Sequence, residues 1–312
     1  MTQKLFYCSE LSRDSGEQVF GTASTGETWL LVEYPYPWGK DALAASAIPP
    51  AVKSHLSQLL KTIPRSRLLF VKQHSRPRAD FYFFVVRARE QRPYVVELKL
   101  TNYDDLRRVN VAAIASGGST EGGALSRDPL YLVCTHGRRD KCCAKFGYAL
   151  YKSLRERHGA AVWQSSHVGG DRFAANLLCF PHGLFYAHVG TDAGARIAEE
   201  YGRGHIVLEN YRGRACYAPQ LQAAEYFVRA ESGTAGLVEL HHAGGARISE
   251  TMWRFRFNAP AEGKIYEAQV SCHQSEFANF ITCAATEAKS VRQFALEEFT
   301  TRADPAHARA DE

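Results

Sequence analysis

The chain has 312 residues, of which 45% are hydrophobic and 23% are charged, and its formal net charge is +5. This length and composition predict an ordinary globular protein of about two domains. The modest positive charge permits an acidic partner but does not require nucleic acid. The sequence has no run of about 18 apolar residues that could cross a membrane. The first residues lack the basic segment and apolar core of a secretory signal, so we expect a cytoplasmic protein.

The first half alternates apolar strand-forming runs with helical patterns. Strands are expected at 28–33, 67–71, 81–86 and 94–100, and helices at 50–62 and 103–115. Two prolines interrupt the loop at 34–39 after the first strand. The stretch at 116–123 is rich in glycine and serine, and it is interpreted as an interdomain linker.

The second half repeats this order. Strands are expected at 131–134, 161–165, 177–180 and 184–189, and helices at 143–158, 193–201 and 217–230. Strand, helix, strand, hairpin and helix in both halves predict an α/β protein with two tandem thioredoxin-like halves, residues 1–122 and 123–232. A small α+β extension is expected at 233–300, with strands at 235–241, 253–257 and 264–272 and a helix at 290–299. A disordered tail is expected at 301–312.

A short polar loop after the strand at 131–134 carries three thiols, Cys134, Cys142 and Cys143. Eight cysteines in a chain of this length are too few for a disulfide scaffold, so clustered thiols are metal ligands, catalytic groups or core residues. The cations Arg138, Arg139 and Lys141 and a helix start near Cys143 favour the thiolate form. The spacing does not match C-x-x-C, so a metal or cluster site, thiol redox chemistry and buried structural cysteines all stay open.

A second polar stretch follows the next predicted strand, with His167 and Asp171 on either side of Gly169-Gly170. The glycine pair favours a turn that lets the backbone approach a bulky group closely. The alternatives are structural roles: a hydrogen-bonded histidine and an aspartate that caps a helix.

Together these stretches resemble a known family. C-T-H-G-x-x-D-x-C-C at 134–143, H-V-G-G-D-R-F-A-A-N at 167–176 and P-H-G-L-F-Y at 181–186 resemble the sucrase/ferredoxin-like family. Gly21-Thr-Ala and the Trp29–Gly39 segment resemble its N-terminal half. The resemblance runs from about Cys8 to Arg229, and the region after Gly233 has no such match.

The resemblance implies a [2Fe–2S] centre held by a C-x8-C pair and an H-x3-H pair, as in fungal members. Cys134 and Cys143 match the cysteine pair, His167 matches the first histidine, and Asp171 stands at the second histidine. A carboxylate is a harder ligand than imidazole, so Asp171 either ligates, orients His167, or cedes its place to Cys142, Cys179 or Cys272. Imidazole ligation raises the reduction potential and makes it depend on pH.

The resemblance thus implies an electron-transfer protein that works with protein redox partners, which the sequence does not identify. Several other functions stay open. Zinc is the inorganic rival, since two cysteines, a histidine and an aspartate can complete a tetrahedral site. A metal-free thiol oxidoreductase and a clusterless binding protein are the rival classes. A glycosidase needs paired carboxylates, which Glu33, Glu97 and Asp171 do not form in sequence. The arginines of the first half favour a solvated surface over a nucleic-acid interface, and Cys272-His273 with Cys283 are expected to be core or surface residues.

Overall fold

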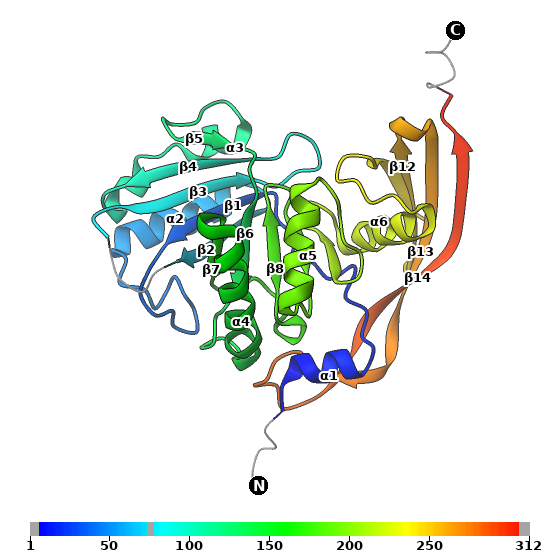
Figure 1. Cartoon of the computed structure of the whole chain (residues 1–312), viewed down its shortest axis with the longest axis horizontal. Helices are drawn as coiled ribbons and strands as arrows, with labels where there is room; N and C mark the ends of the chain where they lie inside the picture. The colour runs from blue at the N-terminus through cyan, green and yellow to red at the C-terminus, as the bar shows by residue number, and fades with distance from the viewer. Residues whose placement is uncertain (1–5, 74–77, 306–312) are drawn as a thin grey trace.

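A ten-stranded mixed sheet runs through both halves of the chain, and a four-stranded antiparallel sheet follows it. The computed structural model describes residues 6–73 and 78–305 (Figure 1). In chain order the strands of the large sheet are β1 (Thr28–Glu33), β2 (Ser66–Lys72), β3 (Phe81–Arg87), β4 (Tyr94–Leu100), β5 (Ala124–Ser126), β6 (Leu130–Cys134), β7 (Val162–Ser165), β8 (Leu177–Phe180), β9 (Leu184–Tyr186) and β10 (Tyr211–Arg214). The α-helices are α1 (Cys8–Asp14), α2 (Pro50–Thr62), α3 (Val111–Ser116), α4 (Lys141–His158), α5 (Thr191–Gly202) and α6 (Pro219–Ser232).

Both halves of the large sheet have the same strand pairing. In the first half, β1 pairs parallel with β2 and antiparallel with β3, and β3 pairs antiparallel with β4. In the second half, β6 pairs in the same way with β7 and β8, and β8 pairs with β9. The halves join edge to edge because β2 pairs antiparallel with β7. Since β5 pairs with β4, residues 124–126 complete the sheet of the first half.

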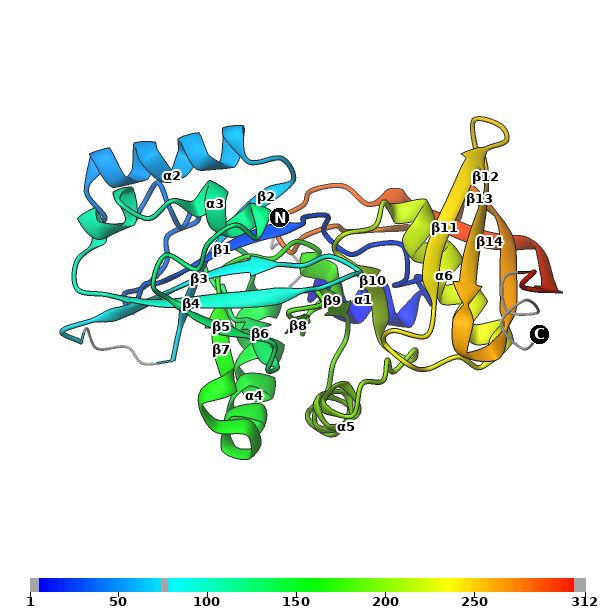
Figure 2. The same ribbon diagram turned by 90° about the horizontal axis from the view of Figure 1, so that it is seen from above.

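Helices cover opposite faces of the two halves. Figure 2 shows α2 and α3 above the first half and α4 and α5 below the second. Leu30 and Val32 of β1 pack with α2, whereas Tyr131 and Val133 of β6 pack with α4 and α5. The alternate residues of these strands meet in a third apolar core, which contains Trp29, Leu132 and Cys134. Successive side chains of a strand point to opposite faces, so Cys134 lies on the face of β6 opposite to Tyr131 and Val133.

The expected helix at 103–115 is interrupted. A 3₁₀ helix covers Tyr103–Arg107, and α3 begins only at Val111 because the Asn110 side chain caps it by accepting a hydrogen bond from the backbone N–H of Ala113. The other 3₁₀ helices are Gly159–Ala161, Asp171–Phe173 and Pro260–Glu262.

The C-terminal extension is a β-sheet rather than the expected α+β unit. Its strands β11 (His241–Arg247), β12 (Met252–Ala259), β13 (Lys264–Asn279) and β14 (Lys289–Ala303) pair in that order. The helix predicted at 290–299 is wrong because this segment lies in β14. A register shift opposite Gln269 and Val270 breaks the two-residue alternation there, which disguised the strand. Residues 301–303, expected in a disordered tail, also pair with β13, and residues 306–312 lie outside the described chain.

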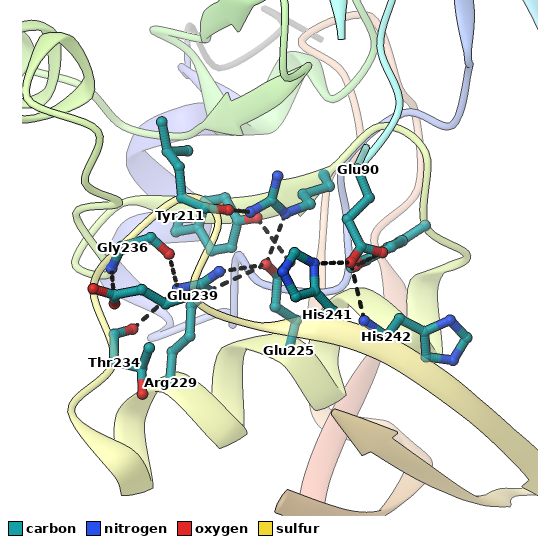
Figure 3. A network of polar contacts seen from close by, with 12 residues as sticks. Glu90, Tyr211, Glu225, Arg229, Thr234, Gly236, Glu239, His241 and His242 are labelled. Carbon is teal, nitrogen blue, oxygen red and sulfur yellow. Dashed lines mark hydrogen bonds and ion pairs between the residues drawn. The ribbon is translucent and has the colours of Figure 1, made fainter. Parts of the chain in front are cut away.

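A buried ionic network fastens the extension to the large sheet (Figure 3). Glu225 of α6 accepts hydrogen bonds from Arg214 Nε at 2.8 Å, Arg229 Nε at 3.1 Å and the Tyr211 hydroxyl at 2.9 Å. The two arginines also donate to backbone carbonyls of the segment that leads into β11, among them Leu237 O. The network thus connects β10, α6 and the start of the extension.

No helix in the described ranges is long and apolar enough to cross a membrane.

Candidate functional site

Cys134 ends β6, and Cys143 lies in the first turn of α4. Asp140 caps this helix, since its side chain accepts a hydrogen bond from the backbone N–H of Cys142 at 2.8 Å. The helix lies very close to the strand end: a Cβ added at Gly147 would be 2.0 Å from the Cys134 carbonyl oxygen. Both sulfurs are buried, with Cys134 1% and Cys143 0% exposed. Glycine at 147 therefore allows the approach that brings the two thiols together.

The two thiols titrate very differently. Hydrogen bonding to Cys143 and to His167 lowers the pKa of Cys134 to about 5, although burial opposes this shift. The neighbouring Cys134 sulfur and burial raise the pKa of Cys143 well above its usual value. The pair therefore favours a thiolate on Cys134 over one on Cys143.

The loop after β7 brings His167 and Asp171 to this thiol pair. Gly169 and Gly170 both have positive φ, at 94° and 80°. The loop is clamped from two sides, because Ser24 Oγ donates to Val168 O at 2.7 Å and Arg212 Nη1 donates to Gly169 O at 3.1 Å. A side chain at Gly169 would collide with Ser24 Oγ, which lies 2.2 Å from the added Cβ. The glycine pair therefore fixes a tight turn, as its sequence predicts.

His167 and Asp171 contact both each other and the thiols. His167 Nδ1 lies 2.9 Å from Asp171 Oδ1, and Cys143 Sγ lies 3.7 Å from the same oxygen. His167 Nδ1 is buried, and Asp171 is its charged neighbour. Burial lowers the pKa of His167, but Asp171 and the Cys134 sulfur outweigh it and raise this pKa to about 9. The structure thus brings all four predicted residues together: Cys134, Cys143, His167 and Asp171, called the Cys134 group below.

His136 supports this group, a role that sequence reasoning did not assign. Its Nδ1 accepts a hydrogen bond from the backbone N–H of His167 at 3.1 Å. Its Nε2 must then carry the proton, which it donates to Gly39 O at 2.7 Å. Burial lowers the pKa of His136 and keeps the ring neutral. The loop of residues 34–39 in the first half therefore positions His167 in the second half.

A surface cavity of about 620 Å³ opens beside the Cys134 group. His167 and His136 line its inner side, and the exposed residues Lys40, Asp41 and Arg139 lie around it. The His167 side chain is 26% exposed, whereas Asp171 is 3% exposed. His167 is thus the member of the group that faces the cavity.

The three other cysteines considered as ligands lie elsewhere. Cys179 packs on the opposite face of the large sheet with Tyr131 and Tyr186. Cys272 pairs with Phe294 in the small sheet. Cys142 turns away from its neighbour Cys143.

Cys142 belongs to a second sulfur group that the sequence did not predict. Its sulfur lies 3.7 Å from that of Cys8 and 3.3 Å from that of Cys283. These cysteines are more than 130 positions from Cys142 along the chain. No local spacing could have found them, and Asp140, which joins the group, is recognisable in sequence only as a helix cap.

Comparison with known proteins agrees with the motifs. The chain is 36% identical over 95 residues to a Debaryomyces hansenii protein named "Altered inheritance of mitochondria protein 32", covering 27% of this chain and 35% of that protein. The Meyerozyma guilliermondii protein of the same name is 31% identical over 97 residues, covering 28% and 34%. The chain thus spans about a third of the length of these curated relatives. No solved structure matches it. The profile described as sucrase/ferredoxin-like matches residues 19–213, more than half of the chain, and the chain belongs to this family.

Proposed function

We propose that the protein transfers single electrons through a [2Fe–2S] cluster held by Cys134, Cys143, His167 and Asp171. The observation that carries the proposal is the meeting of these four side chains from β6, α4 and the loop after β7. When bound, the cluster supplies a centre that takes up and gives back one electron. The family membership supports the same assignment.

The donor chemistry of the Cys134 group fits such a cluster. Two cysteines supply the soft thiolates that iron–sulfur clusters require. His167 Nδ1 and Asp171 Oδ1 lie 2.9 Å apart, so both donor atoms are directed into the same buried space. Asp171 is the remaining donor within reach, because the alternatives Cys142, Cys179 and Cys272 lie elsewhere. Binding would displace protons from His167 and Cys143, so it is favoured as the pH rises.

The geometry favours this proposal over its two chemical rivals. A single zinc ion needs all donors close together, and in the described residues the group with every donor within 4.8 Å is the one around Cys8, not the Cys134 group. Thiol–disulfide exchange needs a sulfur that a second sulfur can attack, whereas Cys134 and Cys143 are 1% and 0% exposed. Electron transfer does not require such contact.

His167 is the proposed route for electrons between the buried centre and a partner. It joins the Cys134 sulfur to the cavity surface, and the charged residues Lys40, Asp41 and Arg139 surround that opening. Two of these three are cations, which suits a protein partner with an acidic docking surface. Electron exchange with such a partner should slow as the salt concentration rises.

An ultraviolet–visible spectrum with iron and sulfide assays on anaerobically purified protein tests the cluster. We expect a red-brown protein with about two irons per chain. Cys143→Ser and His167→Gln should lose most of this iron, whereas Cys216→Ser, at a cysteine outside both sulfur groups, should retain it. Colourless, iron-free wild-type protein refutes the proposal.

The ligand role of Asp171 has its own test. A carboxylate leaves a negative charge where fungal members place a neutral imidazole, so Asp171→His should raise the reduction potential. Protein-film voltammetry of the two forms measures the difference. An unchanged potential with full iron content contradicts ligation by Asp171.

We also propose that each half is a thioredoxin-like unit. The support is the repeated order of strand, helix, strand and hairpin with identical pairing in both halves. An experimental structure in which either half departs from this pairing refutes the proposal.

A further inference from the structure

Three thiols and one carboxylate converge beside α1, outside the Cys134 group. The sulfurs of Cys8, Cys142 and Cys283 are separated by 3.7, 3.3 and 3.5 Å. Asp140 Oδ2 lies 3.8 Å from the Cys8 sulfur, and the ligand atoms of all four residues lie within 4.8 Å of one another. We propose that these residues, called the Cys8 group, bind one zinc ion that holds both ends of the chain to α4.

The distances match one tetrahedral ion. Zinc–sulfur bonds of about 2.3 Å at tetrahedral angles place two sulfurs about 3.8 Å apart. The three sulfur–sulfur distances are close to this value and far from the roughly 2.05 Å of a disulfide. Three thiolates and a carboxylate form a closed four-ligand set of the kind that structural zinc sites have.

Asp140 is held in place by backbone groups on both sides. Its Oδ1 accepts from the N–H of Cys142 at 2.8 Å, and its Oδ2 accepts from the N–H of Cys283 at 2.7 Å. Each carboxylate oxygen has a further lone pair, so either can also ligate an ion. The Cys283 sulfur in turn accepts from the Cys8 N–H at 3.4 Å. Such N–H contacts to the donors are typical of support around metal ligands.

The four residues come from segments far apart in the chain. Cys8 begins α1, Asp140 and Cys142 lie at the start of α4, and Cys283 lies in the turn between β13 and β14. Figure 1 shows this long hairpin reaching from the small sheet to α1. Phe6 and Phe280 also pack against each other in a tilted arrangement, with ring centroids 4.6 Å apart. An ion here would close a connection between the first and last described elements.

The group combines three buried residues with one partly exposed residue. Cys8 and Cys142 are fully buried, and Asp140 is 4% exposed. Cys283 is the partly exposed member, on a turn at the surface. Cys283 is therefore the member of the group that an ion can reach from the surface.

Metal analysis of the 312-residue chain, purified without chelator, tests this proposal. We expect about one zinc per wild-type chain and an at least fivefold loss in Cys283→Ser and in Cys8→Ser. Cys272→Ser is the matched control, because Cys272 is a partly exposed cysteine of the same hairpin outside the group. The control should keep its zinc.

The test separates this zinc site from the proposed cluster. Cys283→Ser should retain iron and colour while losing zinc. Cys143→Ser should lose iron and colour while retaining zinc. If wild-type protein arrives without zinc, titration with Zn²⁺ against a chromophoric chelator measures binding, and Co²⁺ gives the sulfur-to-cobalt absorption of a tetrahedral thiolate site. Equal zinc in wild type and Cys283→Ser overturns the proposal. So does a wild type that neither contains nor binds zinc, or alkylation and mass spectrometry that find two of the three thiols in a disulfide.

Discussion

Gly147 offers the sharpest test of how the fold positions the two thiols. In Gly147→Ala the new Cβ would lie 2.0 Å from the Cys134 carbonyl oxygen, more than 1 Å inside an ordinary carbon–oxygen contact of about 3.3 Å. The obstacle is backbone, so α4 must move away from β6. Overpacking of this kind costs about 1–3 kcal/mol or more, while alanine gains about 1 kcal/mol of helix propensity. Because the obstacle cannot move aside, we take the upper end of the overpacking range and expect a net loss of about 2 kcal/mol.

Urea unfolding measures this loss. With a slope of about 3 kcal/mol/M, the midpoint should fall by about 0.7 M. Gly202→Ala in α5 is the control, because its Cβ would meet nothing within 4 Å, and its midpoint should stay or rise. Iron bound by folded Gly147→Ala should also fall, since Cys134 and Cys143 no longer keep their spacing. Equal midpoints for Gly147→Ala and wild type would refute the close-approach argument.

Two further predictions concern the buried ionisable residues. Glu225→Gln leaves Arg214 and Arg229 buried without their carboxylate, so we expect a loss of about 3 kcal/mol in urea unfolding. The control Glu231→Gln, exposed on the same helix, should change stability by less than about 0.5 kcal/mol, and equal effects of the two would contradict the role of the network in Figure 3. His182 has its pKa lowered to about 4 by burial and by Arg214. Below its unfolded pKa of about 6.5 the unfolded chain binds a proton that the folded chain does not, so stability falls as the pH drops from about 6.5 to about 4, by up to about 3 kcal/mol. His182→Asn should flatten this part of the pH–stability curve, and an unchanged slope would show that His182 does not cause it.

Strands in the large sheet were predictable where apolar runs are uninterrupted. The run at 28–33 is buried along its whole length as β1. Such a run can be recognised as a strand without knowing which strands it pairs with. The pairing of β2 with β7 was not predictable, because it joins segments far apart in the chain. The error at 290–299 arose where a register shift breaks the alternation of β14. Local sequence patterns therefore identify helices and strands, but they do not identify which strand edges pair.

The Cys134 group was predictable because local sequence carries it. A strand end, a helix start and a glycine turn each place one or two of its members, and the motif spacing keeps them together. His136 was harder to assign, since its partner Gly39 belongs to the other half. The Cys8 group had no local signal, because tertiary contacts alone bring its three cysteines together. Sequence thus anticipated the group built within one half and missed the one built from three segments far apart in the chain.

The Cys142-Cys143 pair connects the two sulfur groups. At the start of a helix, successive side chains point about 100° apart, so neighbouring cysteines can serve different sites. Cys143 faces Asp171 and Cys134, whereas Cys142 faces Cys8 and Cys283. Asp140 fixes this arrangement because it caps the helix and also binds the N–H of Cys283. A displacement of the β13–β14 turn would therefore also shift the start of α4. Zinc in the Cys8 group would hold the same helix turn that carries Cys143, so the two sulfur groups would share one structural support while keeping separate ligands.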